Sequence, residues 1–437
     1  MNGDLLTHSK EGENMKQIKA IVVGYGDRGS IYASYALEHP EELQIIAVVD
    51  PNQKRLDLAK QLHHLNDEQL FNDLDKCLAK DLPCDLYING TMDQIHYEVL
   101  KKLLKTKKAI LTEKPIVNNK EQLLELEDLA KKNNSSVFVG HVLRYTPFYK
   151  TIKQLLVDGE IGEIRSMEMA EHVGLAHFAG SYIRGKWRNE QECGSTLLLA
   201  KSCHDIDIMC WLNNSATPKY VSSLGGRYFY RRENAPKDSA ERCHLCPHQE
   251  SCYYSALNCY VKAHFSNELT LIDYNSQSEE EIKEFLKTSE FGRCVYKIDE
   301  SNVVDRQVVN VEFDNGSVCT FTLVGGTEEA CRTINIVGTK GEITGKLEEG
   351  IVYLKKDKLS STIPEIQKID VNLQVHHGDR LTGHSGGDYE IMKSIVRYMN
   401  GDRNMITITK LSDSINGHLC VYAADEARIK HQTIEIK

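Results

Sequence analysis

The first part of the chain alternates short apolar runs with longer stretches in which apolar residues recur every three or four positions. The runs are rich in Val and Ile and predict strands at 18–23, 43–49, 85–89, 109–112 and 136–140. The stretches 94–105 and 120–132 have helical spacing. This alternation predicts a parallel sheet with helices on both faces, and ligands bind such a sheet beyond the carboxyl ends of its strands.

The pattern changes after about residue 145. Helical segments at 147–157 and about 195–212 enclose a predicted strand near 163–172. Alternating apolar and polar residues then predict strands at 303–313, 317–324, 332–337 and 350–354. Two helices, at 386–399 and 411–431, close the chain. This second part is therefore predicted to be an α+β domain with a mostly antiparallel sheet.

The first predicted strand runs into a glycine turn, Gly24 to Gly29, with the pattern Gly-x-Gly-x-x-Gly. Gly24 permits the tight turn, Gly26 lets the backbone approach a pyrophosphate, and Gly29 lets the next helix pack on the strand. The second strand ends in Asp50, whose carboxylate can accept a hydrogen bond from a ribose 2′-hydroxyl. The turn therefore predicts a dinucleotide site.

The cofactor is predicted from charge. Asp50 would repel the 2′-phosphate of NADP, so NAD is favoured, while the nearby Lys54 and Arg55 keep NADP open.

Length, charge and cysteine content exclude some classes of protein. A chain of 437 residues predicts two or three domains. The net charge of −10 argues against general binding to nucleic acid or to an anionic membrane. No apolar run approaches the roughly 20 residues of a membrane span. Residues 1–15 are polar and predict a disordered tail, and thirteen scattered cysteines favour a reducing, cytoplasmic location.

Further motifs follow in a fixed order. Asn89-Gly90-Thr91 and Glu113-Lys114-Pro115 end two predicted strands and should face the same crevice as the glycine turn. Gly140-His141-Val142-Leu143-Arg144-Tyr145 and Cys203-His204-Asp205-Ile206-Asp207 come after them. Together with the glycine turn and Asp50, these motifs resemble the Gfo/Idh/MocA oxidoreductases over essentially the whole chain from about residue 16.

The resemblance implies a fold class of α/β plus α+β, with an N-terminal Rossmann parallel sheet at 16–142. A C-terminal, mostly antiparallel open-sheet domain at 143–437 would bind substrate and mediate oligomerisation, as a homodimer or homotetramer. The implied reaction depends on NAD(P) and usually acts on a sugar or cyclitol. The residues predicted to bind the cofactor are Gly24, Gly26, Asp27, Arg28, Gly29, Asp50, Thr91, Glu113 and Lys114.

Two residues are predicted to be catalytic. Oxidation of a secondary alcohol needs a base and a nearby positive charge. Lys114 supplies the charge, and Pro115 holds it in extended backbone; in the family this lysine contacts substrate. His204 is the candidate acid or base because imidazole titrates near neutrality, and Asp207 lies one helical turn further on. The alternative is that His204 is buried and only orients substrate.

The sequence departs from the family pattern beside this histidine. Many members carry Asp four residues before it, where this chain has Ala200. Lys201 is the neighbour that can replace the missing charge, which predicts a site with two lysines.

A segment rich in His, Tyr, Arg and Trp, residues 172–188, has side chains suited to binding sugars through polar groups and stacked rings. Arg144 and Tyr145 should join it at the cleft. His384 opens the penultimate helix and is a further candidate, the alternative being an ordinary helix start in which Asp388 favours the dipole. The predicted substrate-binding residues are Arg144, Tyr145, His172, His177, Trp187, Lys201 and His384.

A cysteine-rich insertion near 240–260 forms a separate group. Cys243, Cys246 and Cys252 are predicted to clip a loop around a structural zinc ion, with Cys259, His244 and His248 as spare ligands. Free cysteines and an iron–sulfur cluster are the alternatives.

The main functional hypothesis is an NAD(P)-dependent oxidoreductase that transfers a hydride between nicotinamide and a secondary alcohol of a sugar, sugar derivative or cyclitol. One alternative is a redox-neutral, NAD-dependent enzyme of the same fold that cleaves glycosides. The other is a non-catalytic regulator that senses a sugar or NAD.

Overall fold

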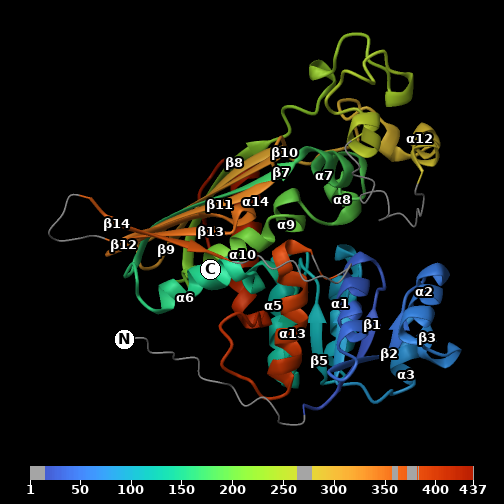
Figure 1. Ribbon diagram of the computed structural model, residues 1–437, viewed down its shortest axis with the longest axis vertical. Helices are drawn as coiled ribbons and strands as arrows, with labels where there is room; N and C mark the ends of the chain where they lie inside the picture. The colour runs from blue at the N-terminus through green and yellow to red at the C-terminus, as the bar shows by residue number, and fades with distance from the viewer. Residues whose placement is uncertain (1–14, 263–277, 357–362, 372–380, 382, 437) are drawn as a thin grey trace.

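The first domain is a parallel sheet covered by helices on both faces (Figure 1). The computed structural model describes residues 15–262, 278–356, 363–371, 381 and 383–436; most of the predicted tail at 1–15 lies outside them. Sheet A has the strand order β3-β2-β1-β4-β5-β6. Its strands are β1 (Ile18–Val23), β2 (Leu43–Val49), β3 (Leu70–Phe71), β4 (Leu86–Asn89), β5 (Ala109–Thr112) and β6 (Val137–Val139). Its helices are α1 (Asp27–Glu38), α2 (Gln53–His63), α3 (Leu74–Ala79), α4 (His96–Leu104) and α5 (Lys120–Asn133).

The second domain is built on sheet B, whose nine strands run β14-β13-β12-β11-β7-β10-β9-β8-β15. β7 and β10 pair in parallel, and the other neighbours pair antiparallel. The strands are β7 (Ile164–Gly174), β8 (Pro218–Gly226), β9 (Arg306–Phe313), β10 (Val318–Thr327), β11 (Cys331–Gly338), β12 (Gly341–Lys346), β13 (Ile351–Lys356), β14 (Glu365–Asp370) and β15 (Ile434–Glu435). The helices are α6 (Pro147–Val157), α7 (Leu175–His177), α8 (Glu190–Cys193), α9 (Leu197–Ala200), α10 (Cys203–Leu212), α12 (Glu279–Thr288), α13 (Gly387–Met399) and α14 (Leu411–Lys430).

The predicted fold class is confirmed, with differences in detail. The pattern over 195–212 predicts one helix, but the structure has α9 and α10, separated at Lys201 and Ser202. Sequence reasoning missed β3, β8, β12, β14 and β15. β14 is exposed almost throughout, so it has no buried face to leave an apolar pattern.

Helix α13 belongs to the core of the first domain although it follows the second in sequence. Ile391, Met392 and Ile395 are fully buried in the same apolar cluster as Tyr32 of α1 and Leu111 of β5. Figure 1 shows α13 beside α1. The helix lies within the predicted C-terminal domain, 143–437, and packs on the first domain.

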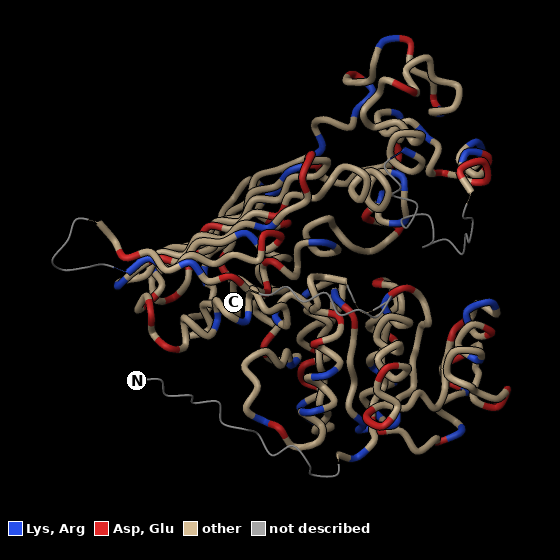
Figure 2. The backbone as a smooth tube through the Cα atoms, in the orientation of Figure 1, with Lys and Arg blue, Asp and Glu red and all other residues tan. Residues whose placement is uncertain are grey.

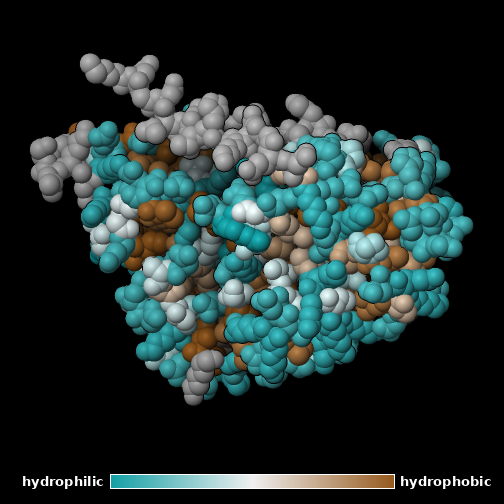
Figure 3. All heavy atoms as spheres, turned by 90° about the horizontal axis from the view of Figure 1, so that it is seen from below, coloured by the Kyte–Doolittle hydropathy of each residue, from teal (hydrophilic) through white to brown (hydrophobic). Residues whose placement is uncertain are grey.

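The outer surface is polar and mixed in charge. Basic and acidic residues are interspersed along both domains (Figure 2). The face in Figure 3 is mostly hydrophilic, with hydrophobic residues in small separate groups. Within the described residues, no helix has the length and hydropathy needed to cross a membrane.

Candidate functional site

The glycine turn lies at the carboxyl end of β1, where the strand order reverses and β1 has β2 and β4 as neighbours. Gly24 has φ +85°, and a Cβ there would lie 2.8 Å from the backbone of Gly90. A Cβ on Gly29 would lie 1.9 Å from the Gly24 carbonyl oxygen. The space at Gly26 is open, because the nearest atom to an added Cβ is 3.8 Å away on Arg55. The turn therefore leaves room for a pyrophosphate at the N-terminus of α1, which fits NAD.

Asp50 lies beside this turn. Its carboxylate accepts hydrogen bonds from the backbone N–H groups of Tyr25 and Asn52, each at 2.8 Å. Arg55 Nη1 lies 3.7 Å from the same carboxylate. Since each carboxylate oxygen has two lone pairs, Asp50 retains acceptor capacity for a ribose hydroxyl. The cation at Arg55 partly neutralises the negative charge that would repel a 2′-phosphate.

Lys114 follows β5 at the same end of sheet A, and its peptide bond to Pro115 is cis. Its Nζ donates to the Ala200 carbonyl oxygen at 2.7 Å. Ala200 is the position at which the resemblance leads us to expect Asp. The structure therefore places a neutral acceptor there and leaves the lysine charge without that carboxylate.

Three imidazoles gather around this lysine. His204 Nδ1 lies 3.4 Å from His141 Nδ1, and its ring centroid is 6.1 Å from that of His384. Burial, followed by the positive charge of Lys114, lowers the pKa of His204 well below its ordinary value of 6.5. His204 is therefore neutral at pH 7, which is the form that accepts a proton.

Asp207 does not pair with His204, as its spacing in the helix suggested. It is bound side-on by Arg144, with both N–O distances at 2.6 Å, and Oδ1 lies 3.6 Å from His141 Nε2. Arg144 is 1% exposed, and the Tyr145 hydroxyl accepts a hydrogen bond from the Thr409 N–H in the interior. These two side chains thus lie behind the histidines, whereas we expected them to contact substrate.

Arg28 and Glu113 were predicted to bind cofactor, but their side chains bind each other. Arg28 Nε donates to Glu113 at 2.9 Å, and its Nη2 donates to Asp388 of α13 at 2.6 Å. Tyr32 also donates to Glu113. Burial acts to raise the pKa of Asp388, but the Arg28 and His384 charges outweigh it and hold that pKa low. This network ties α13 to the glycine turn.

Lys201 lies in a buried cluster next to the site. Its Nζ is 3.4 Å from both Glu171 Oε1 and His177 Nε2, and Arg332 bridges Glu171 and Asp205 at 2.6 and 2.8 Å. Burial raises the pKa of Glu171 to about 7, although both cations oppose the shift. Burial lowers the pKa of Lys201, and the charge of Lys114 adds to this effect.

The C-terminal end of the 172–188 segment contacts the first domain beside sheet A. Trp187 Nε1 lies 3.4 Å from Asp93, and Lys186 stacks over the Trp187 ring at 4.2 Å. Burial lowers the pKa of Lys186, a residue that sequence reasoning missed because lone lysines in loops carry no signal. His172 lies outside the cluster and contacts Cys331 Sγ at 3.7 Å.

The remaining predicted cofactor residues lie on the same edge. The hydroxyl of Thr91 donates to Asn89 Oδ1 at 2.7 Å. Asp27 begins α1 directly after Gly26. The sequence motif Gly140–Tyr145 contains His141, but sequence reasoning missed it as a site residue. Its signal is its position two residues after β6, at the carboxyl edge of the sheet.

Comparisons with known proteins agree with this architecture. A family model described as oxidoreductase family, NAD-binding Rossmann fold, matches residues 18–141, and one described as oxidoreductase family, C-terminal alpha/beta domain, matches 153–436. The chain is 23% identical over 370 residues to the putative oxidoreductase YteT of Bacillus subtilis, covering 80% of this chain and 82% of YteT.

Two further relatives carry more specific names. Inositol 2-dehydrogenase of Corynebacterium glutamicum is 25% identical over 205 residues, which are 46% of this chain and 55% of that protein. The structure of levoglucosan dehydrogenase in complex with NADH and L-sorbose superposes with a TM-score of 0.68 at 15% identity, covering 97% of this chain and 100% of that one.

Proposed function

This chain belongs to the Gfo/Idh/MocA oxidoreductase family, and we propose that it catalyses the NAD-dependent oxidation of a secondary alcohol in a sugar, sugar derivative or cyclitol. The observation that carries the proposal is the position of Lys114. Its charge lies at the carboxyl edge of sheet A, next to the glycine turn, and acts on both His141 and His204.

NAD, when bound, supplies a nicotinamide ring that accepts a hydride from the alcohol carbon. The N–H groups at the start of α1 would hold its pyrophosphate, and Asp50 would accept from its ribose. Glu113 and Arg28 would support the turn from behind rather than bind the cofactor, because their side chains are already paired.

In this proposal Lys114 and His204 act on the same alcohol group in different ways. The Lys114 ammonium stabilises the negative charge that develops on the substrate oxygen. Neutral His204 accepts the hydroxyl proton. His141 lies between His204 and Asp207, so the ion pair of Arg144 and Asp207 fixes the orientation of the imidazoles without touching substrate.

Sugars and cyclitols are the favoured substrate class for two reasons. Lys201, His177 and Trp187 bring donors and an aromatic ring to the same edge as Lys114. Inositol and levoglucosan, in the names of two relatives, are both rigid polyols.

The first test is a screen of sugars, cyclitols and glycosides with NAD and with NADP, followed by NADH absorbance and by mass spectrometry of products. We expect a keto product in equal amount to NADH, with faster turnover on NAD because Asp50 disfavours the 2′-phosphate. A product panel with no ketone from any polyol would contradict the proposal.

One observation favours the redox-neutral alternative. Glu171 is buried beside Lys201, and burial raises its pKa to about 7. A dehydrogenase that uses His204 as its base does not need the Glu171 carboxyl. A glycoside-cleaving enzyme needs an additional acid to protonate its leaving group. Release of an aglycone without net NADH in the same screen would select this alternative.

Replacing His204 by Gln is expected to lower kcat by about 10²-fold, because a positioned base contributes at least this much. In the wild type the acid limb of kcat/KM should lie below pH 6.5, since burial and the Lys114 charge keep the imidazole neutral down to that pH. The variant should lose this limb. The measurement is a pH–rate profile, with His172→Gln as the matched control because His172 lies outside the cluster. An acid limb that persists unchanged in His204→Gln would contradict the role.

A further inference from the structure

The segment after β8 carries a group of cysteines that the proposed reaction does not use. From Arg227 to Ala256 the described elements are 3-10 helices of three residues each, Arg232–Asn234 and Cys243–Leu245. The segment's apolar residues divide between the main cluster of the second domain, which holds Tyr230 and Cys294, and a smaller cluster, which holds Cys243 and Ala256. A long segment with so little regular structure needs another source of stability.

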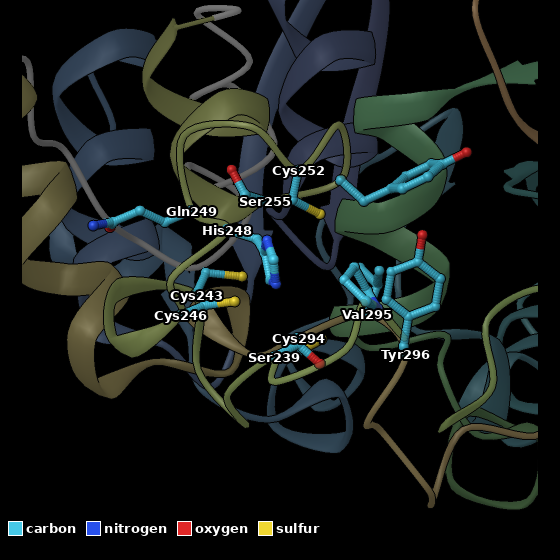
Figure 4. Close-up of a pocket in the computed structure, with 12 residues that line it drawn as sticks. Ser239, Cys243, Cys246, His248, Gln249, Cys252, Ser255, Cys294, Val295 and Tyr296 are labelled. Carbon is cyan, nitrogen blue, oxygen red and sulfur yellow. The ribbon is translucent and has the colours of Figure 1, made fainter. Parts of the chain in front are cut away.

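Four cysteines line one small cavity in this segment (Figure 4). They are Cys243, Cys246, Cys252 and Cys294, and the cavity has a volume of about 10 Å³. The 3-10 turn brings Cys246 N to within 3.1 Å of the Cys243 carbonyl, and Figure 4 shows both sulfurs on the same side of the cavity.

Cys294 comes to this group from a distant part of the sequence. A β-bridge pairs Arg242 with Arg293, and Cys294 N donates to the Glu241 carbonyl at 2.9 Å. These contacts set Cys294 beside Cys243. Cys259, which the spacing offered as a spare ligand, does not line the cavity.

The buried side chain of Arg184 is independent evidence that a negatively charged group belongs at the cysteines. Arg184 is fully buried and donates to the carbonyls of Arg293 and Tyr254, each at 2.8 Å. Its other partners are the Tyr260 hydroxyl and Cys243 Sγ, the latter at 3.7 Å. Among the residues that the structure describes, no carboxylate contacts this guanidinium. A buried charge without a counterion is costly, so the arrangement calls for an anionic group at the cysteines.

We propose that Cys243, Cys246, Cys252 and Cys294 bind one zinc ion as four thiolates. Zinc prefers this tetrahedral ligand set, and the resulting centre carries a net charge of about −2, for which Arg184 is the counterion. No three of these sulfurs lie within 4.8 Å of one another, so binding must turn the side chains inward to the separation of about 3.8 Å that Zn–S bonds require.

The site would be structural, but it lies next to the proposed substrate segment. Arg184 ends the π-helix Phe178–Arg184, which carries Tyr182, and His177 comes directly before that helix. The zinc centre would therefore hold the end of this segment at Arg184, three residues before Trp187, which contacts Asp93 of the first domain.

The test is metal analysis by mass spectrometry of the full-length protein, purified without a metal-affinity step. We expect about one zinc per chain in the wild type. Cys246→Ser, at a half-exposed position, and Cys294→Ser should lose it. Cys259→Ala and His248→Ala are matched controls that should keep it, since Cys259 does not line the cavity and His248, which does, has its Nε2 2.7 Å from the Lys237 carbonyl oxygen. Circular dichroism checks that each variant is folded.

Replacing zinc by cobalt in the wild-type protein tests the proposal even if a variant fails to fold. The wild type loaded with Co²⁺ should show the thiolate charge-transfer band and visible bands of a tetrahedral tetrathiolate. Wild-type protein without bound metal, iron together with acid-labile sulfide, or zinc retained by Cys294→Ser and lost from Cys259→Ala would each overturn the assignment.

Discussion

Replacing Lys114 by Met is expected to lower kcat by about 10³-fold while leaving NAD affinity nearly unchanged. The methionine fills similar volume but removes the charge that stabilises the developing alkoxide. The pyrophosphate contacts expected at the start of α1 do not involve this side chain, so cofactor binding should persist. Turnover on the substrate found by the screen and NAD binding by calorimetry measure the two effects.

The control for this variant is Lys102→Met, because Lys102 lies on the outer side of the same domain and pairs with Asp75 at 2.7 Å. Its kinetics should match the wild type. If Lys114→Met keeps wild-type turnover, the alcohol oxygen is not stabilised by Lys114, and the role we give it is wrong. Loss of NAD binding in parallel with turnover would instead place the lysine on the cofactor.

Replacing Asp207 by Asn is expected to lower the free energy of unfolding by about 3–5 kcal/mol, because it leaves the Arg144 guanidinium buried without its counterion. Arg144 and Asp207 are each 1% exposed or less and form two hydrogen bonds of 2.6 Å. Urea unfolding followed by circular dichroism and tryptophan fluorescence measures the loss. Trp211 reports directly, since Arg144 lies 5.5 Å over its ring.

The matched variant is the double replacement Arg144→Met with Asp207→Leu. Removing both charges together removes the penalty of an unpaired ion, so this protein should recover most of the stability lost by Asp207→Asn. Its activity should stay low, because His141 would lack the carboxylate that orients it. Equal losses of stability in the single and double variants would show that the two charges do not act as a pair.

The parts of the fold set by local pattern were predicted well from sequence. The strands Ile18–Val23 and Leu43–Val49 and the helix Pro147–Val157 match their predicted bounds, because each has a continuous apolar run or a regular helical face. The helix break near Lys201 was missed because the apolar spacing continues through it. Thr196 caps the start of α9 by accepting a hydrogen bond from Leu199 N, but it does not mark where that helix ends.

In the candidate site, too, residues in local motifs could be predicted from sequence, whereas contacts between distant segments could not. Lys114 and His204 stand next to short motifs, so sequence could single them out. Their partners could not be found this way. The contacts of Asp207 with Arg144, of Arg28 with Asp388 and of Cys243 with Cys294 join segments that only folding brings together. Spacing along one helix suggested that Asp207 pairs with His204, but the choice of partner was decided by a residue on another element.

The position of α13 in the sequence also affects when the first domain can finish folding during synthesis. The Rossmann sheet is synthesised before the second domain, yet α13, the helix that closes one of its faces, follows most of that domain in sequence. Until then Tyr32 and Leu111 lack the cover that Ile391 and Ile395 give them. The apolar surface of the nascent first domain therefore stays exposed to solvent while most of the second domain is synthesised. We therefore expect the N-terminal third, produced without α13, to expose the apolar surface that this helix covers.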